Sequence, residues 1–349
     1  MHRNPDDDHD HIRIFRPEEE QDELEDLTTL GNDPDVPQRP TLDAVFEMFD
    51  EGKVNHSTLV GLTDLDRDQA NEVRQRWPLV PQALRESAMQ IIDELGEDRF
   101  DLHFGRFLRI ALEDESEIVR QYAISGLWTD SGDDLPGRLL DILRDDVSDD
   151  VRIQAALSLG PYAEAAELGE LDADLGKRIR EGLFAVLEDS GEPLALRRRA
   201  LESVAVFADD PRLGLEIESM YEDDDVGLRS SAVFAMGRSQ DRAWYPTLLR
   251  ELTNDDAEVR YEAARAVGQF GDTSALPVLG ALAKDEDAEV RLAAIAAIGE
   301  IGGRAAMRML QKLAEDERPD VEVEALDDAM TEVSIFEADD DPHDEDEDD

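Results

Sequence analysis

The sequence has no cysteine among its 349 residues, which excludes disulfide bonds, thiol nucleophiles, thiolate-bound zinc and iron–sulfur clusters together. Lysine is also scarce, because only Lys53, Lys177, Lys284 and Lys312 occur and the other basic residues are arginine. No apolar run approaches the ~18 residues that span a bilayer, and the first residues lack the apolar core of a secretory signal. We therefore expect a cytoplasmic protein without membrane contact.

Positive charge is the next shortage, since 88 acidic residues face 35 basic ones and the formal net charge is -53. Residues 1–40 contribute -9 and residues 337–349 contribute -10, which leaves -34 on residues 41–336. Dense carboxylates with scarce lysine resemble the cytoplasmic proteins of salt-accumulating archaea. Self-repulsion on this scale opposes folding in dilute buffer, whereas at molar salt the Debye length falls to roughly 3 Å. We therefore expect a halophilic host.

A repeated pattern covers most of the chain: an apolar residue, then arginine, then alanine three positions after the arginine. The seven anchor arginines are Arg85, Arg120, Arg152, Arg197, Arg229, Arg260 and Arg291, and an eighth copy has Glu322 in the arginine position. Their successive spacings are 35, 32, 45, 32, 31, 31 and 31 residues. Such a fixed interval is typical of a stacked repeat architecture.

Each copy predicts a pair of helices. Apolar residues at -1, +4 and +7 from the anchor form the one-sided stripe of an amphipathic helix, and a second apolar segment precedes it. Good N-cap residues stand four positions before five of the anchors: Ser116, Ser148, Asp225, Asp256 and Asp287. Glycine at +8 in four copies (Gly160, Gly237, Gly268 and Gly299) predicts a helix end that needs a left-handed residue.

The segments DDAEVRYEAARAVGQFGDTSALPVL (255–279) and DEDAEVRLAAIAAIGEIGG (285–303) resemble HEAT repeats of the phycobilisome-lyase-like kind. The resemblance covers roughly residues 79–336 and implies an all-α fold, a right-handed α-solenoid of about eight helical pairs. One helix of each pair would line a concave face. Such repeats occur in scaffolds, adaptors, a few chromophore lyases and the metal-dependent deoxyhypusine hydroxylases.

The flanks of the repeat array have their own composition. We predict a disordered acidic tail over residues 1–40, an N-terminal helical cap over 41–78, the solenoid over 79–336 and a disordered acidic tail over 337–349. The 45-residue spacing places an insertion at about 161–175. This insertion either contributes to a binding face or caps a bend in the stack.

The anchor arginines lie near the apolar stripe, so we interpret them as a structural ladder that reaches carboxylates or carbonyls of neighbouring loops. Positions +1, +2 and +5 lie opposite that stripe, where a concave face would display them. The predicted partner-binding residues there are Tyr122, Gln154, Leu157, Arg198, Arg199, Phe234, Tyr261 and Arg265. Aromatic and arginine side chains are enriched at interface hot spots, although packing against adjacent repeats would also explain them.

Residues suited to catalysis or metal binding are sparse. Only His56 and His103 lie outside the predicted tails, and the His-Glu dipeptides of the hydroxylase branch are missing. No nucleophile elbow, phosphate-binding loop or EF-hand loop occurs, so we predict no catalytic residue, no metal site and no cofactor. One segment of the first tail, HDHIRIFRP (9–17), is unusual because Ile12, Ile14 and Phe15 interrupt a polar stretch; it is a candidate docking motif or a chance cluster.

The sequence therefore predicts a monomeric, non-catalytic scaffold or adaptor that binds a protein or peptide through the concave face. A first alternative is a lyase-like or protein-modifying enzyme. A second is nucleic-acid binding through the local cluster Arg197, Arg198 and Arg199, against which the small basic surface argues.

Overall fold

The computed structural model describes residues 39–128, 132 and 134–339, and within these ranges all regular elements are helical. The all-α expectation is confirmed. The chain forms two compact units, and the boundary between them in the sequence lies between Leu135 and Pro136. Each unit has its own core and its own cavity. The docking candidate at residues 9–17 and most of the two predicted tails lie outside the described ranges.

The described part of unit 1 contains six α-helices and a compact aromatic core. The helices are α2 (Leu42–Asp50), α3 (His56–Leu59), α4 (Arg67–Arg76), α5 (Gln82–Asp98), α6 (Gly105–Ala111) and α7 (Glu117–Ser125), with short 3-10 turns at Val60–Leu62 and Trp77–Leu79. The Trp77 ring packs edge to face against Phe49 and Phe107, with centroid distances of 5.9 and 4.9 Å. These contacts join α2, the turn after α4 and α6 into one core.

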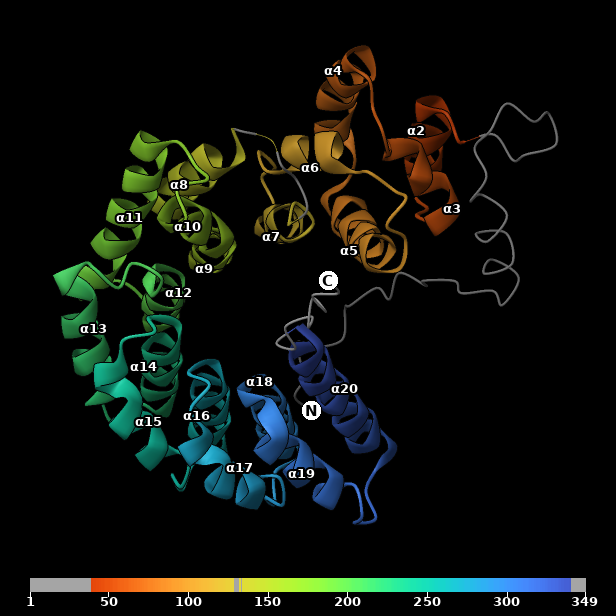
Figure 1. The fold of residues 1–349 in the computed structure, drawn as a ribbon. Coiled ribbons are helices and arrows are strands. Elements are labelled where there is room, and N and C mark those ends of the chain that lie inside the picture. Colours follow the sequence, from red (N-terminus) through yellow and green to blue (C-terminus); the bar gives the residue numbers. More distant parts are fainter. Residues whose placement is uncertain (1–38, 129–131, 133, 340–349) are drawn as a thin grey trace, which may run out of the picture. The chain divides into compact units, whose positions relative to one another are not determined.

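Unit 2 continues with α8, which starts at the unit boundary, and stacks its helices in two layers (Figure 1). Its helices are α8 (Leu135–Asp145), α9 (Asp149–Ser158), α10 (Gly160–Glu167), α11 (Ala173–Glu188), α12 (Leu194–Val204), α13 (Pro211–Tyr221), α14 (Val226–Arg238), α15 (Tyr245–Glu251), α16 (Ala257–Gln269), α17 (Leu276–Leu282), α18 (Ala288–Ile301), α19 (Gly303–Leu313) and α20 (Asp320–Asp339). The inner layer holds the anchor-bearing helices α12, α14, α16, α18 and α20, and α11, α13, α15, α17 and α19 form the outer layer (Figure 1). This arrangement is that of an α-solenoid.

The +8 glycines mark helix ends as predicted, because α14, α16 and α18 stop one or two residues after Gly237, Gly268 and Gly299. The predicted left-handed conformation is wrong, because all three have helical backbone angles without a positive φ. A Cβ on Gly268 would lie 2.8 Å from Cα of Ala297 on the next inner helix, and one on Gly237 would lie 2.8 Å from Cα of Ala266. These glycines are therefore needed for close approach of helix backbones rather than for a left-handed residue.

Gly160 also differs from the expectation, because it is the first residue of α10 and has no positive φ. A Cβ there would lie 3.3 Å from Oγ of Ser203 on α12. In all four copies, the glycine permits contact with the next inner helix.

The anchor arginines hold the loops between helices. Six of them donate to a carbonyl upstream of their own helix: Arg85 to Val80, Arg120 to Asp114, Arg152 to Leu143, Arg229 to Asp223, Arg260 to Asn254 and Arg291 to Asp285, at 2.6–2.9 Å. Arg197 instead lies 3.9 Å from the carboxylate of Glu216 on α13. These bonds satisfy carbonyls that the helix ends leave unpaired.

Four anchors also pair with a carboxylate of the following repeat: Arg85 with Asp114, Arg152 with Glu192, Arg260 with Asp285 and Arg291 with Glu322. Glu322 occupies the anchor position of the last repeat and is buried, where it accepts from Arg291 and from Arg318. In the last copy, the carboxylate of Glu322 thus pairs with the anchor arginine of the preceding repeat. Glu322 also pairs with Arg318, and this is the last ion pair of the anchor positions.

The predicted N-cap positions are confirmed, but two of them work differently from the rest. Asp225, Asp256 and Asp287 accept hydrogen bonds from backbone N–H groups of their helices. Ser116 and Ser148 occupy N-cap positions without a side-chain cap bond. As at the three aspartate caps, their own N–H groups donate to a side-chain oxygen two positions earlier, here the carboxylates of Asp114 and Asp146.

The insertion and the C-terminal boundary are now defined. Residues 160–167 form α10, and the turn that follows leads to α11 at Ala173. The last helix, α20, extends to Asp339, so the first three residues of the predicted tail 337–349 are helical rather than disordered. No helix among the described residues has the length and apolarity needed to cross a membrane.

Candidate functional site

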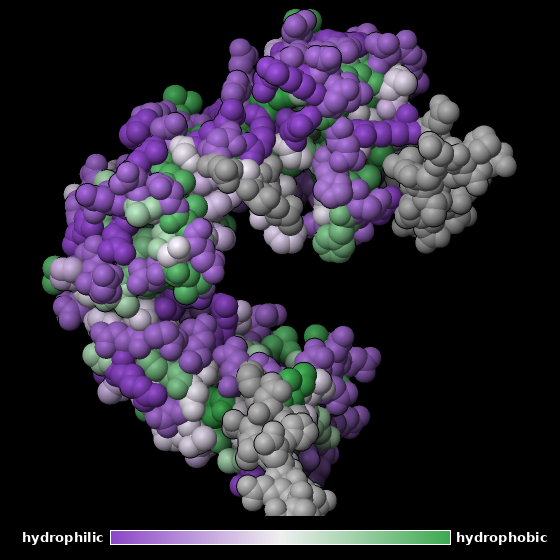
Figure 2. All heavy atoms as spheres, turned by 45° about the horizontal axis from the view of Figure 1, so that its top comes forward, coloured by the Kyte–Doolittle hydropathy of each residue, from purple (hydrophilic) through white to green (hydrophobic). Residues whose placement is uncertain are grey.

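Unit 2 contains a groove of about 580 Å³ on its inner layer, between α10 and α16. Its lining residues are Leu157, Gly160, Pro161, Glu164, Arg198, Arg199, Glu202, Ser203, Val206, Ser230, Ser231, Phe234, Arg238, Glu258, Glu262, Arg265 and Gln269. Four of these are arginines and four are glutamates, so the groove is nearly neutral in a chain of net charge -53. Hydrophilic residues cover most of the surface in Figure 2, and hydrophobic ones gather in separate patches.

The floor of the groove is a hydrogen-bond network between α12 and α14. The Arg198 Nε donates to Ser231 Oγ at 2.9 Å, and that hydroxyl donates to Glu202 at 2.8 Å. Glu202 also pairs with Arg199. Arg198 extends to Glu258 at the start of α16, with 3.2 Å between Nη2 and Oε1. The network therefore connects three successive inner helices.

Arg265 lies over two aromatic rings and is the most exposed of the four arginines that line the groove. Its guanidinium carbon is 5.5 Å from the ring centre of Tyr261 and 6.0 Å from that of Phe234. Its ion pair with Glu262 is long, at 3.4 Å, and its side chain is 43% exposed. A cation held over aromatic faces in this way is partly desolvated while it remains available to a ligand.

Glu262 is a carboxylic acid of the groove whose pKa lies near neutral pH. Burial raises the pKa of its carboxyl to about 7, and the nearby charges of Glu202 and Glu258 add to this, while Arg265 and Arg198 oppose it. Its side chain is 17% exposed. Burial disfavours the charged form of the carboxyl and so favours its protonation. When Glu262 is protonated, the net charge of the groove becomes more positive by one unit.

The inserted helix α10 forms one wall of the groove. Pro161 and Glu164 line it, and Glu164 pairs with Arg238 at the end of α14, at 2.6 Å. The hollow thus exists where the regular interval of the repeats is broken. The first part of the insertion, helix α10, therefore forms part of the groove surface.

The structure brings together five of the eight predicted partner-binding residues: Leu157, Arg198, Arg199, Phe234 and Arg265 line the groove. Tyr261 contacts it through Arg265. Gln154 lies on α9 and is not part of the lining. Tyr122 belongs to unit 1 and lines the cavity there.

Several lining residues were missed by the sequence reasoning. Ser231 and Glu262 stand at +2 from their anchors, so the rule that found Arg199 would have found them too. Glu164 and Pro161 follow no repeat position, because they belong to the insertion. The 45-residue spacing marks the insertion at 161–175 as one candidate for a binding face, but no pattern singles out these two residues within it.

The three adjacent arginines of α12 do not form a basic patch. Arg197 faces Glu216 on the outer layer, whereas Arg198 and Arg199 face Glu258 and Glu202 in the groove. Since each cation has a nearby carboxylate, little positive potential is left for a phosphate backbone. This arrangement argues against the nucleic-acid alternative.

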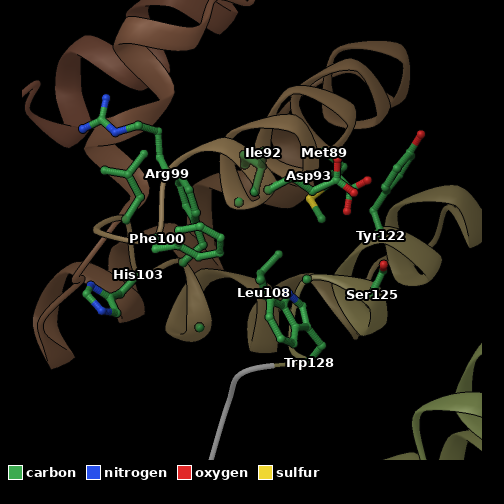
Figure 3. A pocket seen from close by; sticks show the side chains of 16 residues that line it. Met89, Ile92, Asp93, Arg99, Phe100, His103, Leu108, Tyr122, Ser125 and Trp128 are labelled. Atoms are coloured by element: carbon green, nitrogen blue, oxygen red, sulfur yellow. The ribbon is translucent and has the colours of Figure 1, made fainter. Parts of the chain in front are cut away.

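Unit 1 has a separate cavity of about 530 Å³, which we call the aromatic pocket (Figure 3). Its floor is apolar and consists of the buried side chains of Met89, Ile92 and Leu108. Phe100 and Trp128 stand at its rim and are 78% and 73% exposed. Exposed rings of this size beside an apolar hollow are a feature of binding surfaces.

One wall of the aromatic pocket is acidic. Asp93 and Glu97 from α5 line it, and burial together with repulsion by Glu97 and Glu94 raises the pKa of the Asp93 carboxyl. Arg99 also belongs to the lining, but its guanidinium points away from the hollow (Figure 3) and bonds Asp101 at 2.8 Å. The pocket therefore combines an apolar floor with an anionic side.

The layered helix pairs define an α-solenoid repeat protein. The family model for HEAT repeats matches residues 215–289 and, in a second overlapping placement, residues 245–328. Residues 215–328, which run from α13 to α20, are therefore a stretch of HEAT repeats. No curated protein matches the chain.

Solved structures of helical proteins show limited similarity to this chain. The CpcE–CpcF complex of phycocyanin lyase from Nostoc is 18% identical, covers 77% of this chain and 95% of that one, and has a TM-score of 0.45. Human deoxyhypusine hydroxylase is 20% identical, with coverages of 77% and 96% and a TM-score of 0.34. Escherichia coli YibA is 17% identical, with coverages of 69% and 96% and a TM-score of 0.40. No activity is transferred from them at such identities.

Proposed function

We propose that the groove of unit 2 binds a segment of a protein partner and that the chain acts as a non-catalytic scaffold or adaptor. The observation that carries this proposal is the local composition of the groove. Partly exposed arginines and Phe234 gather there with glutamates to give a neutral hollow, although the chain as a whole is strongly acidic. Arginine and aromatic residues contribute most of the binding energy at protein interfaces.

The groove suits a segment with an apolar side chain next to a carboxylate. Phe234 and the half-exposed Leu157 offer the apolar contact, and Arg265 offers a cation held above two rings. Because the lining residues lie on helices that pack against each other, little conformational entropy is lost when a partner binds.

A non-catalytic role is supported by the state of the hydroxyl groups in the groove. The Ser231 hydroxyl donates to Glu202, and the Ser203 hydroxyl donates to the Ala156 carbonyl at 2.8 Å. The described lining of the groove contains no histidine that would act as a base for either hydroxyl.

Site-specific photo-crosslinking tests the proposal. A benzoylphenylalanine at Phe234 is compared with one at Leu215, an exposed residue of the outer-layer helix α13. We expect a discrete crosslinked partner in native lysate from position 234 and none from position 215. Equal crosslinking at the two positions, or crosslinking at 215 alone, would contradict the proposal.

The identified partner is then titrated against the variant Arg265→Glu. Loss of the cation should weaken binding by at least ~10-fold, the effect of about 1.4 kcal/mol that separates hot-spot residues from their neighbours. Arg144→Glu is the matched control, because Arg144 lies outside the groove and pairs only with exposed aspartates of its own helix. An unchanged dissociation constant for Arg265→Glu would exclude the groove as the binding site.

A further inference from the structure

The aromatic pocket of unit 1 has the chemistry of a binding site for an apolar segment that carries a positive charge. Its floor and rim are hydrophobic and one wall is acidic, while the guanidinium of Arg99 in the lining points away from the hollow and bonds Asp101. Asp93 lies on this wall beside Glu97, and burial together with the charges of Glu97 and Glu94 raises the pKa of its carboxyl, so an arginine placed in the pocket would relieve like-charge repulsion.

One segment of the same chain matches this chemistry. Residues 12–16, Ile-Arg-Ile-Phe-Arg, alternate large apolar side chains with arginine. Residues 1–40 otherwise contain only Arg3 and Arg39 as arginine or lysine, so no other stretch of this tail has arginine between large apolar residues. The segment therefore offers both the apolar and the cationic part of a ligand for the pocket.

The described chain begins close to the pocket. Arg39 donates to the Gly61 carbonyl at 3.4 Å and lies 3.8 Å from the Asp64 carboxylate. The Asp64 backbone N–H in turn donates to the carbonyl of His103, at 2.9 Å, and His103 lines the pocket. The starting point of the tail is thus two contacts away from the cavity.

The length of the tail permits the contact. Twenty-two residues separate Arg16 from Arg39, and a chain of that length spans up to roughly 75 Å when extended. Since the two sites belong to one chain, their effective concentration is in the millimolar range for a linker of this order. Even a weak individual contact would then be populated.

We propose that residues 12–16 dock into the aromatic pocket of the same chain. The apolar side chains lie against Phe100 and Trp128, and an arginine lies against Asp93 and Glu97. This contact covers Phe100 and Trp128, the two most exposed aromatic rings among the described residues of unit 1, and is independent of the groove in unit 2.

The test uses the full chain, which has three tryptophans and no cysteine. Tryptophan is replaced by 5-fluorotryptophan, its fluorine signals are assigned with Trp128→Phe, and a nitroxide is attached through Asp10→Cys. We expect the Trp128 signal to be lost with the oxidised nitroxide and to return when ascorbate reduces it.

Two variants in the same labelled chain separate docking from mere proximity. Changing Ile12, Ile14 and Phe15 to Asp should restore the Trp128 signal in the oxidised state. Leu27→Asp, a change of an apolar residue elsewhere in the tail, should leave the signal lost. If the triple variant leaves the Trp128 signal as weak as in the parent, or if the parent shows no loss, the proposal is overturned.

A mixing experiment distinguishes the same chain from a second copy. Chains that carry the nitroxide but no fluorine are mixed with fluorinated chains that carry no nitroxide. We expect no loss of the Trp128 signal in the mixture. A loss that grows with concentration would place the segment in the pocket of another copy and would overturn docking within one chain.

Discussion

Gly268 lies against Ala297 so closely that a Cβ at position 268 would be 2.8 Å from the Ala297 Cα and 2.9 Å from its Cβ. The two Ala297 atoms are backbone or directly attached to it, so they cannot move aside without shifting a helix, and the Glu300 carboxylate oxygen, 2.5 Å from that Cβ, would have to move as well. The variant Gly268→Ala should therefore lose stability by about 1–3 kcal/mol through overpacking, despite the higher helix propensity of alanine. Urea denaturation followed by circular dichroism measures this loss.

Gly214 provides the matched control for that prediction. It lies within α13, and a Cβ there would meet no atom within 4 Å. Gly214→Ala should stabilise the protein by up to ~1 kcal/mol, because alanine favours the helix and nothing resists it. Equal effects of the two substitutions would show that helix propensity, not helix contact, determines the outcome.

Asp114 joins three parts of unit 1, and its replacement should be severe. Its carboxylate accepts from the Trp77 indole at 2.7 Å and from Arg85, and its side chain is almost fully buried. Asp114→Asn leaves the Arg85 charge buried without a counterion, which costs about 3–5 kcal/mol. Thermal denaturation measured by near-ultraviolet circular dichroism, which reports the Trp77 environment, should show this loss.

Asp145→Asn is the comparison for the Asp114 variant. Asp145 pairs with Arg144 at 2.7 Å, but both side chains are about two-thirds exposed. Water replaces the lost bond there, so the melting temperature should hardly change. A similar loss in both variants would mean that burial is not the cause.

The Glu262 carboxyl should make stability depend on pH. Its pKa is about 7 in the folded chain, whereas the ordinary value is 4.5, so the folded state binds more protons than the unfolded state between these values. Stability from this group is complete below pH 4.5 and is lost as pH rises through 7. Glu262→Gln cannot ionise, so from pH 5 to pH 8 it should become more stable relative to the parent by on the order of 1–3 kcal/mol.

The measurement is the difference in unfolding free energy between the Glu262→Gln variant and the parent at a series of pH values. The difference cancels the titration of groups that both chains share. A difference that stays constant over this range would show that Glu262 is ionised throughout.

We propose that the chain is adapted to concentrated salt. Its acidic excess lies largely outside the two tails, and repulsion among surface carboxylates is strongly screened at molar ionic strength, where the Debye length is about 3 Å. The melting temperature should rise from dilute buffer to molar KCl. Equal thermal stability in the two conditions would refute the adaptation.

The sequence predicts the helix pairs well because apolar residues recur at the same spacing around the anchor of each repeat. Residues 257–269 and 288–301 follow that period and form α16 and α18. The conformation of the +8 glycines was misinterpreted because a glycine near the end of a helix has the same sequence signal whether it is left-handed or contacts a neighbour. Only the position of Ala297 beside Gly268 separates the two cases.

The groove could be predicted only in part for a similar reason. Arg198, Phe234 and Arg265 occupy repeat positions whose direction follows from the helical period. The opposite wall depends on how α10 folds back toward α14, and the ion pair of Glu164 with Arg238 joins residues that are far apart in the chain. Contacts of this kind have no local signature.

The inserted helix α10 carries none of the anchor arginines, and the glycine contacts that set the distance between later repeats do not involve its wall residues, Pro161 and Glu164. Substitutions on that wall can therefore alter which ligand the groove accepts while the stacking of the array is retained. Evolution, or a protein engineer, could use α10 as an exchangeable module for changing specificity on an otherwise constant framework.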